Sequence, residues 1–230
     1  MKEDYIRGSE KTWDSIAKSF DKTRRKAWQE CIDFIENTSK NSVIVDVGSG
    51  NGRHLIPSSK QCNYAIGIDV STEMLKVVQE KIVNEKINNV TLIHSSAENI
   101  PLKNNSADAV LYIAALHSIP GRENRVKSLK EIKRILKKDG KLLVSVWSRY
   151  QDKFRKKFLK ESLNKKKIGF GDKYVYWTQD KLDVKRFYHL YSKKELIEEL
   201  NEAGFKILSV KGMKIRSEKY NDNYFAIVKP

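Results

Sequence analysis

The sequence has few cysteines and no long apolar run. Cys31 and Cys62 are its two cysteines, and their positions match neither a paired metal spacing nor a disulfide framework. They indicate ordinary thiols in a reducing compartment. Residues 1–13 lack the apolar core of a signal peptide, and no run approaches the length that spans a membrane. We therefore expect a cytoplasmic protein with no metal site of its own.

Negative charge is also scarce. Lys and Arg number 45 against 29 Asp and Glu, a formal net charge of +16. This excess favours an anionic partner, either nucleic acid or an acidic membrane, and a Lys-rich soluble protein is the plain alternative. Half of the excess lies in residues 149–186, with 13 Lys and Arg against five Asp and Glu. The lysines of that segment, among them Lys165, Lys166 and Lys167, either hold phosphates or form a solvated face.

Apolar periodicity predicts alternating helices and strands. Five helices are expected, at 12–20, 25–37, 71–86, 122–140 and 192–204. Ser71 or Thr72 opens the third helix, and Gly140 is placed to end the fourth. Strands are expected at 42–48, 64–70, 89–95, 107–116, 141–147, near 205–211 and at 223–228.

This order of elements indicates an α/β fold with a doubly wound, mostly parallel, seven-stranded sheet and helices on both faces. The last two strands follow each other without a helix, so we expect a hairpin at one edge and an antiparallel last strand. Residues 149–186 break the alternation. The prediction is one domain over 1–230, with N-terminal helices in 9–37 and a substrate-binding insertion at 149–186.

A glycine-rich segment follows the first predicted strand. It reads "VIVDVGSGNGRHL" over 43–55, and Gly48, Gly50 and Gly52 allow a tight turn and a close approach of a ligand to the backbone. Arg53 stands where a dinucleotide-binding loop has glycine or alanine, and no P-loop lysine follows. Asp69 lies 21 residues after Gly48, where an acid can accept hydrogen bonds from both ribose hydroxyls of a nucleoside.

These residues resemble the glycine loop and acid of class I S-adenosylmethionine-dependent methyltransferases, which have a Rossmann-like fold. Ala97 and Glu98 match the segment that flanks adenine in such enzymes, and Asp108 opens the fourth strand in the family register. Asp46 matches the acid that orders the loop and faces the methionine amine. The resemblance implies S-adenosylmethionine as the cofactor.

Further motifs bear on which group accepts the methyl. Residues 113–125 lack the Asn/Asp-Pro-Pro-aromatic motif of base amine methylation, and both cysteines precede the region where a C5 nucleophile would lie. The segment 114–147 instead resembles the tRNA wobble-uridine carboxymethyl methyltransferases, which esterify the carboxylate of 5-carboxymethyluridine. Shorter matches are "FDKTRRKAW" at 20–28, "YVYW" at 174–177, "RFYHLYS" at 186–192 and "NDNYFAIVK" at 221–229. Two departures are a single histidine, His117, followed by Ser118, and Tyr176 in place of a frequent proline.

The resemblance implies an acceptor pocket formed by Arg186, Tyr188 and His189, with Arg24 and His117 beside it. Plainer alternatives are a satisfied core histidine at 189, a solvated helix face at 24 and a structural histidine at 117. The resemblance also implies two partners. They are the anticodon loop of tRNA and a small zinc-containing activator subunit that adds a strand at a sheet edge.

Two other functions compete with this prediction. The segment "SAENIPLKNNSADAV" also occurs in methyltransferases of quinones and sterols, so a small-molecule substrate is one alternative. A non-catalytic RNA-binding scaffold with a vestigial pocket is the other. The basic insertion and the 186–191 signature argue against the first, and the intact glycine loop and Asp69 argue against the second.

Overall fold

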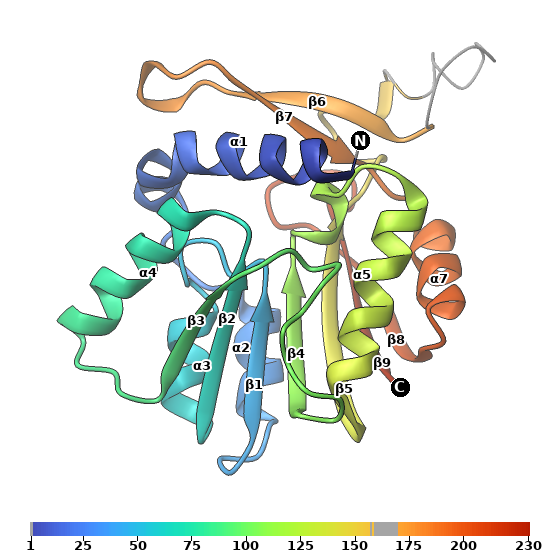
Figure 1. The fold of residues 1–230 in the computed structure, drawn as a ribbon. Coiled ribbons are helices and arrows are strands. Elements are labelled where there is room, and N and C mark those ends of the chain that lie inside the picture. The colour runs from blue at the N-terminus through green and yellow to red at the C-terminus, as the bar shows by residue number, and fades with distance from the viewer. Residues whose placement is uncertain (1, 157, 159–169) are drawn as a thin grey trace.

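A seven-stranded sheet forms the centre of the protein (Figure 1). The computed structural model describes residues 2–156, 158 and 170–230. The strand order is β3-β2-β1-β4-β5-β9-β8, and β9 is antiparallel to both of its neighbours. This confirms the expected fold. The strands are β1 (Val43–Val47), β2 (Tyr64–Asp69), β3 (Val90–His94), β4 (Ala107–Ile113), β5 (Leu136–Trp147), β8 (Lys206–Met213) and β9 (Asn223–Lys229).

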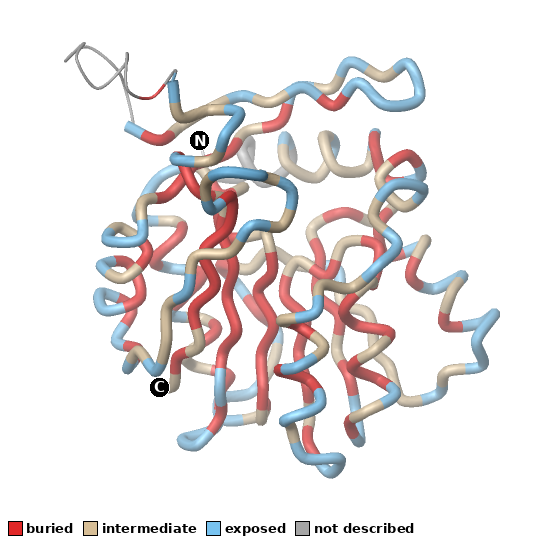
Figure 2. The backbone as a smooth tube through the Cα atoms, turned by 180° about the vertical axis from the view of Figure 1, so that it is seen from behind, coloured by how far each residue is buried: buried red, intermediate tan, exposed pale blue. Residues whose placement is uncertain are grey.

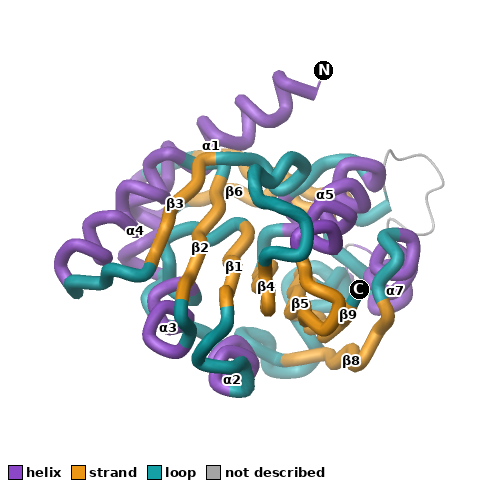
Figure 3. Tube along the Cα trace, turned by 60° about the horizontal axis from the view of Figure 1, so that its bottom comes forward, coloured by secondary structure: helices purple, strands orange, loops and turns teal. Residues whose placement is uncertain are grey.

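Apolar side chains on both faces of the sheet explain why its central strands are buried. Ile44, Val45 and Val47 of β1 have no exposed surface, as expected of a parallel strand covered on two sides. Figure 2 shows this burial running through the middle of the molecule. One face packs against α2 (Gln29–Glu36), α3 (Leu55–Gln61) and α4 (Thr72–Asn84), and the other against α5 (Arg122–Ile135) and α7 (Lys193–Glu202) (Figure 3).

Two helix starts follow local capping signals. The Ser71 side chain accepts a hydrogen bond from the Met74 amide at 3.1 Å, which caps α4. Ser192 and Glu195 form a reciprocal capping box at the start of α7. Both starts confirm the predictions, because a cap depends on residues that are adjacent in the sequence.

The predicted end of the fourth helix at Gly140 is wrong. The helix α5 stops at Ile135, and Gly140 lies inside β5. The carbonyls of Arg134 and Ile135 accept hydrogen bonds from the amides of Asn105 and Ser106 at 3.1 and 2.8 Å. A tertiary contact with the loop before β4 therefore ends the helix, and the chain turns directly into β5.

The N-terminal region also differs from the expectation. The helix α1 (Lys2–Thr23) begins well before residue 12 and ends before Arg24. The next helix begins at Gln29 instead of 25, because Trp28 has an extended backbone with φ −79° and ψ 145°. No helix was predicted for α3, which follows the glycine loop.

A second layer covers the carboxyl ends of the parallel strands (Figure 1). It consists of α1 and a two-stranded hairpin, β6 (Asp172–Trp177) and β7 (Val184–His189). The hairpin lies in and just after the predicted insertion, for which no strand was predicted. Lys165, Lys166 and Lys167 lie outside the described residues.

Candidate active site

A cavity of about 480 Å³ lies between the carboxyl edge of the sheet and this second layer. One end is lined by the glycine loop and by residues that follow β2 and β3. The other end is lined by aromatic and basic side chains from α1, the η1 turn (Leu116–Ser118) and the hairpin. The topology thus brings the predicted cofactor and acceptor residues to a single cavity, except Asp46, Gly52 and His189. After these predictions we name its two ends the cofactor end and the acceptor end.

The glycine loop forms the floor of the cofactor end. Gly48, Gly50 and Gly52 have φ values of +68°, +53° and +75°, a region that side chains rarely adopt. A Cβ atom on Gly48 would come within 2.5 Å of the Cβ of Ala115. Gly48 and Gly50 line the cavity, whereas Gly52 does not, and a Cβ there would meet Val78 at 3.0 Å. Gly52 therefore serves the close packing of the loop on α4.

Asp69 joins the loop to the end of β2. Its carboxylate accepts hydrogen bonds from the Gly50 amide at 2.7 Å and the Ser71 amide at 2.8 Å. Burial raises its pKa, and these backbone hydrogen bonds oppose that shift. Each carboxylate oxygen has a second lone pair, so Asp69 can also accept hydroxyl donors in the cavity that it lines.

Two buried polar atoms near the loop have no partner among the described residues. They are Oδ2 of Asp46 and Oγ of Ser49. Burial and the nearby Asp69 raise the pKa of Asp46 to about 8, and Arg53 opposes the shift. Ser49 lines the cavity, and Asp46 is not among the lining residues. Unsatisfied polar groups of this kind fit a zwitterionic cofactor with an amine and hydroxyls.

The segment after β3 supplies another wall of the cofactor end. Ala97 and Glu98 both line the cavity, and Glu98 is buried. Asp108 lies at the opposite end of the sheet. Its carboxylate accepts the Val43 amide at 2.9 Å and binds Lys137. Of these three residues, only Ala97 and Glu98 are placed to contact a ligand in the cavity.

Arg186 carries a buried positive charge at the acceptor end. Its guanidinium lies over the rings of Trp177 and Trp13, at 4.9 and 5.7 Å, and donates to the Tyr188 hydroxyl at 2.5 Å. No carboxylate pairs with it within the described part of the chain, and its Nε has no hydrogen-bond partner there. Burial lowers its pKa, partly offset by Tyr188. A buried guanidinium of this kind suits an anionic ligand.

His117 lies beside Arg186 in a defined tautomer. Its Nδ1 accepts a hydrogen bond from the Trp147 amide at 3.0 Å, so the proton of the neutral ring is on Nε2. Burial, with His189 and Arg186, lowers its pKa to about 3. Tyr188 packs nearby and stacks on Trp147 with ring centroids 4.6 Å apart. His117 is therefore a neutral hydrogen-bond donor to the cavity that it lines.

Three further arginines line the same cavity. Arg24 lies over Trp177 at 5.3 Å, and Arg53 lies over Trp28 at 4.5 Å. Burial and the charges of Arg216, Arg53 and Arg186 lower the pKa of Arg24 to about 10. Arg216 comes from the loop between β8 and β9, where the Asp222 carboxylate accepts its amide at 2.6 Å.

Sequence reasoning missed two of these arginines. In the sequence, Arg53 was used only to exclude a dinucleotide-binding site. Its place directly after the third glycine could have indicated that it lines the cavity. Arg216 had no signal, because only the packing of its loop brings it to the cavity.

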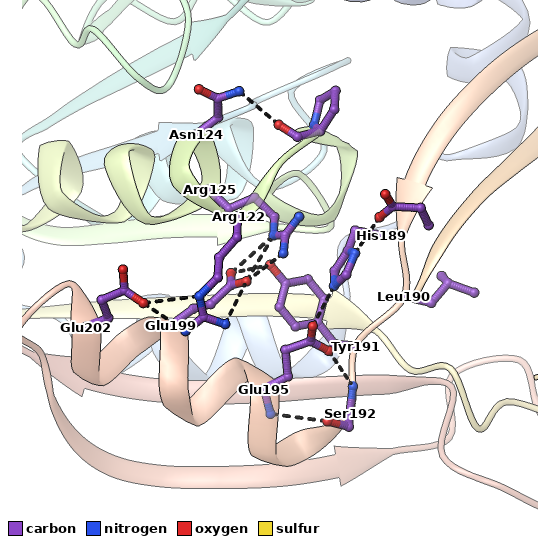
Figure 4. Close-up of polar contacts among 12 residues, drawn as sticks. Arg122, Asn124, Arg125, His189, Leu190, Tyr191, Ser192, Glu195, Glu199 and Glu202 are labelled. Atoms are coloured by element: carbon purple, nitrogen blue, oxygen red, sulfur yellow. Dashed lines mark hydrogen bonds and ion pairs between the residues drawn. The ribbon is translucent and has the colours of Figure 1, made fainter. Parts of the chain in front are cut away.

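His189 lies outside the cavity, unlike Arg186 and Tyr188. Figure 4 shows its ring bonded to Glu195. Its two ring nitrogens contact Asp172 at 2.6 Å and Glu195 at 2.9 Å. Burial lowers its pKa, but hydrogen bonds to these carboxylates outweigh that effect and raise it. Side chains alternate along β7, so His189 and Tyr188 point to opposite faces. His189 therefore ties the hairpin to α7.

A neighbouring network holds α7 against α5 beneath the hairpin. Arg125 binds the buried carboxylate of Glu199 at 2.7 Å, and the Tyr191 hydroxyl donates to the same carboxylate at 2.7 Å. Arg149 binds Glu195 and the Leu190 carbonyl. Figure 4 shows the contacts of Glu199 and His189 side by side. These buried contacts position the strand that carries Arg186.

The described residues contain no group of three or more His, Cys, Asp or Glu side chains that could hold a metal ion. No helix among them is long and apolar enough to cross a membrane.

Comparisons with known proteins agree with this geometry. Residues 45–144 match a methyltransferase domain family. The chain is 33% identical over 154 residues to a Xenopus tropicalis tRNA (carboxymethyluridine(34)-5-O)-methyltransferase, covering 66% of this chain and 23% of that protein. It is 28% identical to the Schizosaccharomyces pombe protein of the same name, covering 85% and 87%. An S-adenosylmethionine-dependent methyltransferase from Clostridium acetobutylicum has the same fold, with a TM-score of 0.70, 16% identity and coverage of 94% and 98%.

Proposed function

Because this chain belongs to the class I S-adenosylmethionine-dependent methyltransferases, we propose that it methylates the carboxylate of 5-carboxymethyluridine at the wobble position of tRNA. The observation that carries the proposal is Arg186, a buried guanidinium that faces the cavity without a carboxylate partner in the described part of the chain. The names of the relatives from Xenopus and fission yeast support the same substrate. The Xenopus protein is about four times as long as the match, so its full activity comes to this chain only as a proposal.

The cofactor end is assigned to the residues that fit it. Asp69 would accept the ribose hydroxyls, Gly48 and Gly50 would let the ligand approach the backbone, and Ala97 and Glu98 would flank adenine. Asp46, behind the cavity lining, would order the loop next to the amine, and Gly52 would hold the loop in place. The cofactor supplies a methyl group on a positively charged sulfur, which an ionised carboxylate can accept without losing a proton.

The residues at the acceptor end therefore need not remove a proton from the substrate. Arg186 would hold the substrate carboxylate through its planar fork, and the fixed orientation places one oxygen for an in-line displacement. The Nε2 proton of His117 would add a neutral hydrogen bond, and Tyr188 and Arg24 would complete the contacts. Tight pairing with arginine also weakens a nucleophile, so Arg186 orients the carboxylate more than it activates it. His189 contributes by positioning the hairpin.

The rate of methyl transfer is expected to be constant from about pH 6 to 8 with both substrates saturating. His117, with a pKa of about 3, stays neutral throughout this range, and a free carboxylate is ionised well below it. Saturating cofactor is needed because Asp46 would titrate near pH 8 in the free protein. The measurement is kcat against pH. A bell-shaped profile centred near pH 6.5 would contradict the proposal and make a histidine the general base.

The direct test of the substrate is methyl transfer by the purified protein. The acceptors are tRNA with 5-carboxymethyluridine at the wobble position and the same tRNA with unmodified uridine. Mass spectrometry of the digested RNA should show the methyl ester only with the first. Methylation of quinones or sterols, with no methylation of RNA, would favour the small-molecule alternative. Cofactor binding without methyl transfer to any acceptor would favour the scaffold.

We also propose a small zinc-containing activator subunit and a cytoplasmic location. Leu208 on the edge strand β8 is 45% exposed, and such apolar surface at a sheet edge is suited to an added strand. The proposed cytoplasmic location fits the thiols of Cys31 and Cys62, which are free and buried. Co-purification with the activator should raise solubility and activity. A protein that is soluble and fully active alone would remove the need for this subunit.

A further inference from the structure

The outer face of the β6–β7 hairpin carries exposed aromatic rings. Tyr174 is 59% exposed and Tyr176 is 52% exposed. The strand register places Tyr174 opposite Phe187 and Tyr176 opposite Lys185, so these four side chains share one face. Figure 2 shows exposed and less exposed positions along this hairpin, at the top of the molecule. We name Tyr174, Tyr176, Lys185 and Phe187 the outer platform.

The opposite face of the same hairpin lines the cavity. Val175, Trp177, Arg186 and Tyr188 alternate with the outer platform and line the cavity. An antiparallel hairpin with one buried face normally presents polar residues on the other. The outer platform has tyrosines at successive outward positions of β6 instead. The alternation therefore leaves aromatic surface that the described residues do not cover.

The chemistry of the outer platform matches a nucleic acid strand. The Lys185 ammonium lies 4.0 Å from the centre of the Tyr174 ring, and the Tyr174 and Phe187 rings meet edge to face at 5.8 Å. Lys185 is exposed and has no carboxylate partner within the described part of the chain. Flat aromatic side chains stack on unpaired bases, and a nearby lysine neutralises phosphate.

The outer platform is also continuous with the cavity. Tyr176 belongs to the outer platform and to the cavity lining, and Trp177 follows it inside. We propose that the outer platform stacks bases of the single-stranded RNA that flanks the target nucleotide. This inference rests on the proposed function, because the target nucleotide must enter the cavity while its neighbours remain outside.

The test measures binding of a fluorescent anticodon stem-loop RNA that contains 5-carboxymethyluridine. Tyr174→Ala is expected to raise Kd by roughly tenfold, and Tyr174→Phe to keep the wild-type value, because stacking needs the ring and not the hydroxyl. Lys185→Ala should lower the slope of log affinity against log salt by about 0.7. Tyr64→Ala is the matched control, an exposed tyrosine at the amino end of β2 that should bind RNA like the wild type.

The outcomes separate this inference from the proposed function. Wild-type methylation of tRNA together with unchanged RNA affinity in Tyr174→Ala and Lys185→Ala would overturn the outer platform alone. Equal losses in Tyr174→Ala and Tyr174→Phe would also overturn it, because stacking would not be the cause. Weakened RNA binding in the alanine variants without any methyl transfer by the wild type would support the outer platform and overturn the proposed substrate. Unchanged cofactor affinity in each variant shows that the fold is kept.

Discussion

Replacing Arg186 with alanine or lysine is expected to lower kcat by about 100-fold or more and to leave cofactor affinity unchanged. The expected loss reflects the geometry of a planar fork over a carboxylate, which a single ammonium does not reproduce. Arg186 lies at the acceptor end of the cavity, away from the glycine loop. The measurements are single-turnover methyl transfer and calorimetry of cofactor binding.

The same variants should not lose stability. Arg186 is 6% exposed and has no carboxylate partner in the described residues, so its removal leaves no buried anion unpaired. The lost contacts with Trp177 and the Tyr188 hydroxyl offset part of this relief, so thermal midpoints close to the wild-type value are expected. Lys60→Ala is the control for loss of positive charge, because Lys60 forms a surface pair with Glu85 at 2.7 Å. Wild-type turnover in Arg186→Ala, or a large fall in its thermal midpoint, would make Arg186 a structural residue.

Asp69→Ala is expected to weaken cofactor binding by roughly 30- to 900-fold, or on the order of 2–4 kcal/mol. Part of the loss comes from the ribose contacts. The rest comes from the loop, because the Gly50 amide loses its acceptor at 2.7 Å. Calorimetry with S-adenosylmethionine and with its demethylated product measures the effect.

Asp108→Asn is the matched control for Asp69. Both carboxylates accept a backbone amide at the end of a strand, but Asp108 lies at the amino end of β4 and does not line the cavity. Its replacement should leave cofactor affinity within about twofold of the wild type. A folded Asp69→Ala protein that binds the cofactor normally would refute the assignment of the ribose site.

The framework of the fold and the cofactor loop could be predicted because their signals are local. Buried parallel strands read as β-branched runs such as 43–47, and a helix cap such as Ser71 depends on the amide three residues later. Positions 48 and 50 have positive φ, which glycine adopts without strain whatever its neighbours are. The predicted cofactor residues Asp69, Ala97 and Glu98 accordingly reach one cavity.

Long-range contacts decided what the sequence could not show. The end of α5 depends on amides at 105 and 106, about thirty residues earlier, so Gly140 was a misleading local signal. Arg216 reaches the cavity only because Asp222 holds its loop.

The tertiary structure also decided which residues of the "RFYHLYS" signature face the cavity. Arg186 and Tyr188 lie on the cavity side of β7, while His189 points away and is held by Asp172 and Glu195. The sequence alone predicted that these residues belong together and that a glycine loop suited to a nucleoside cofactor precedes them. Their division between cavity and core required the strand, its pairing partner and α7, because the direction of a side chain is set by the backbone that neighbouring elements hold in place.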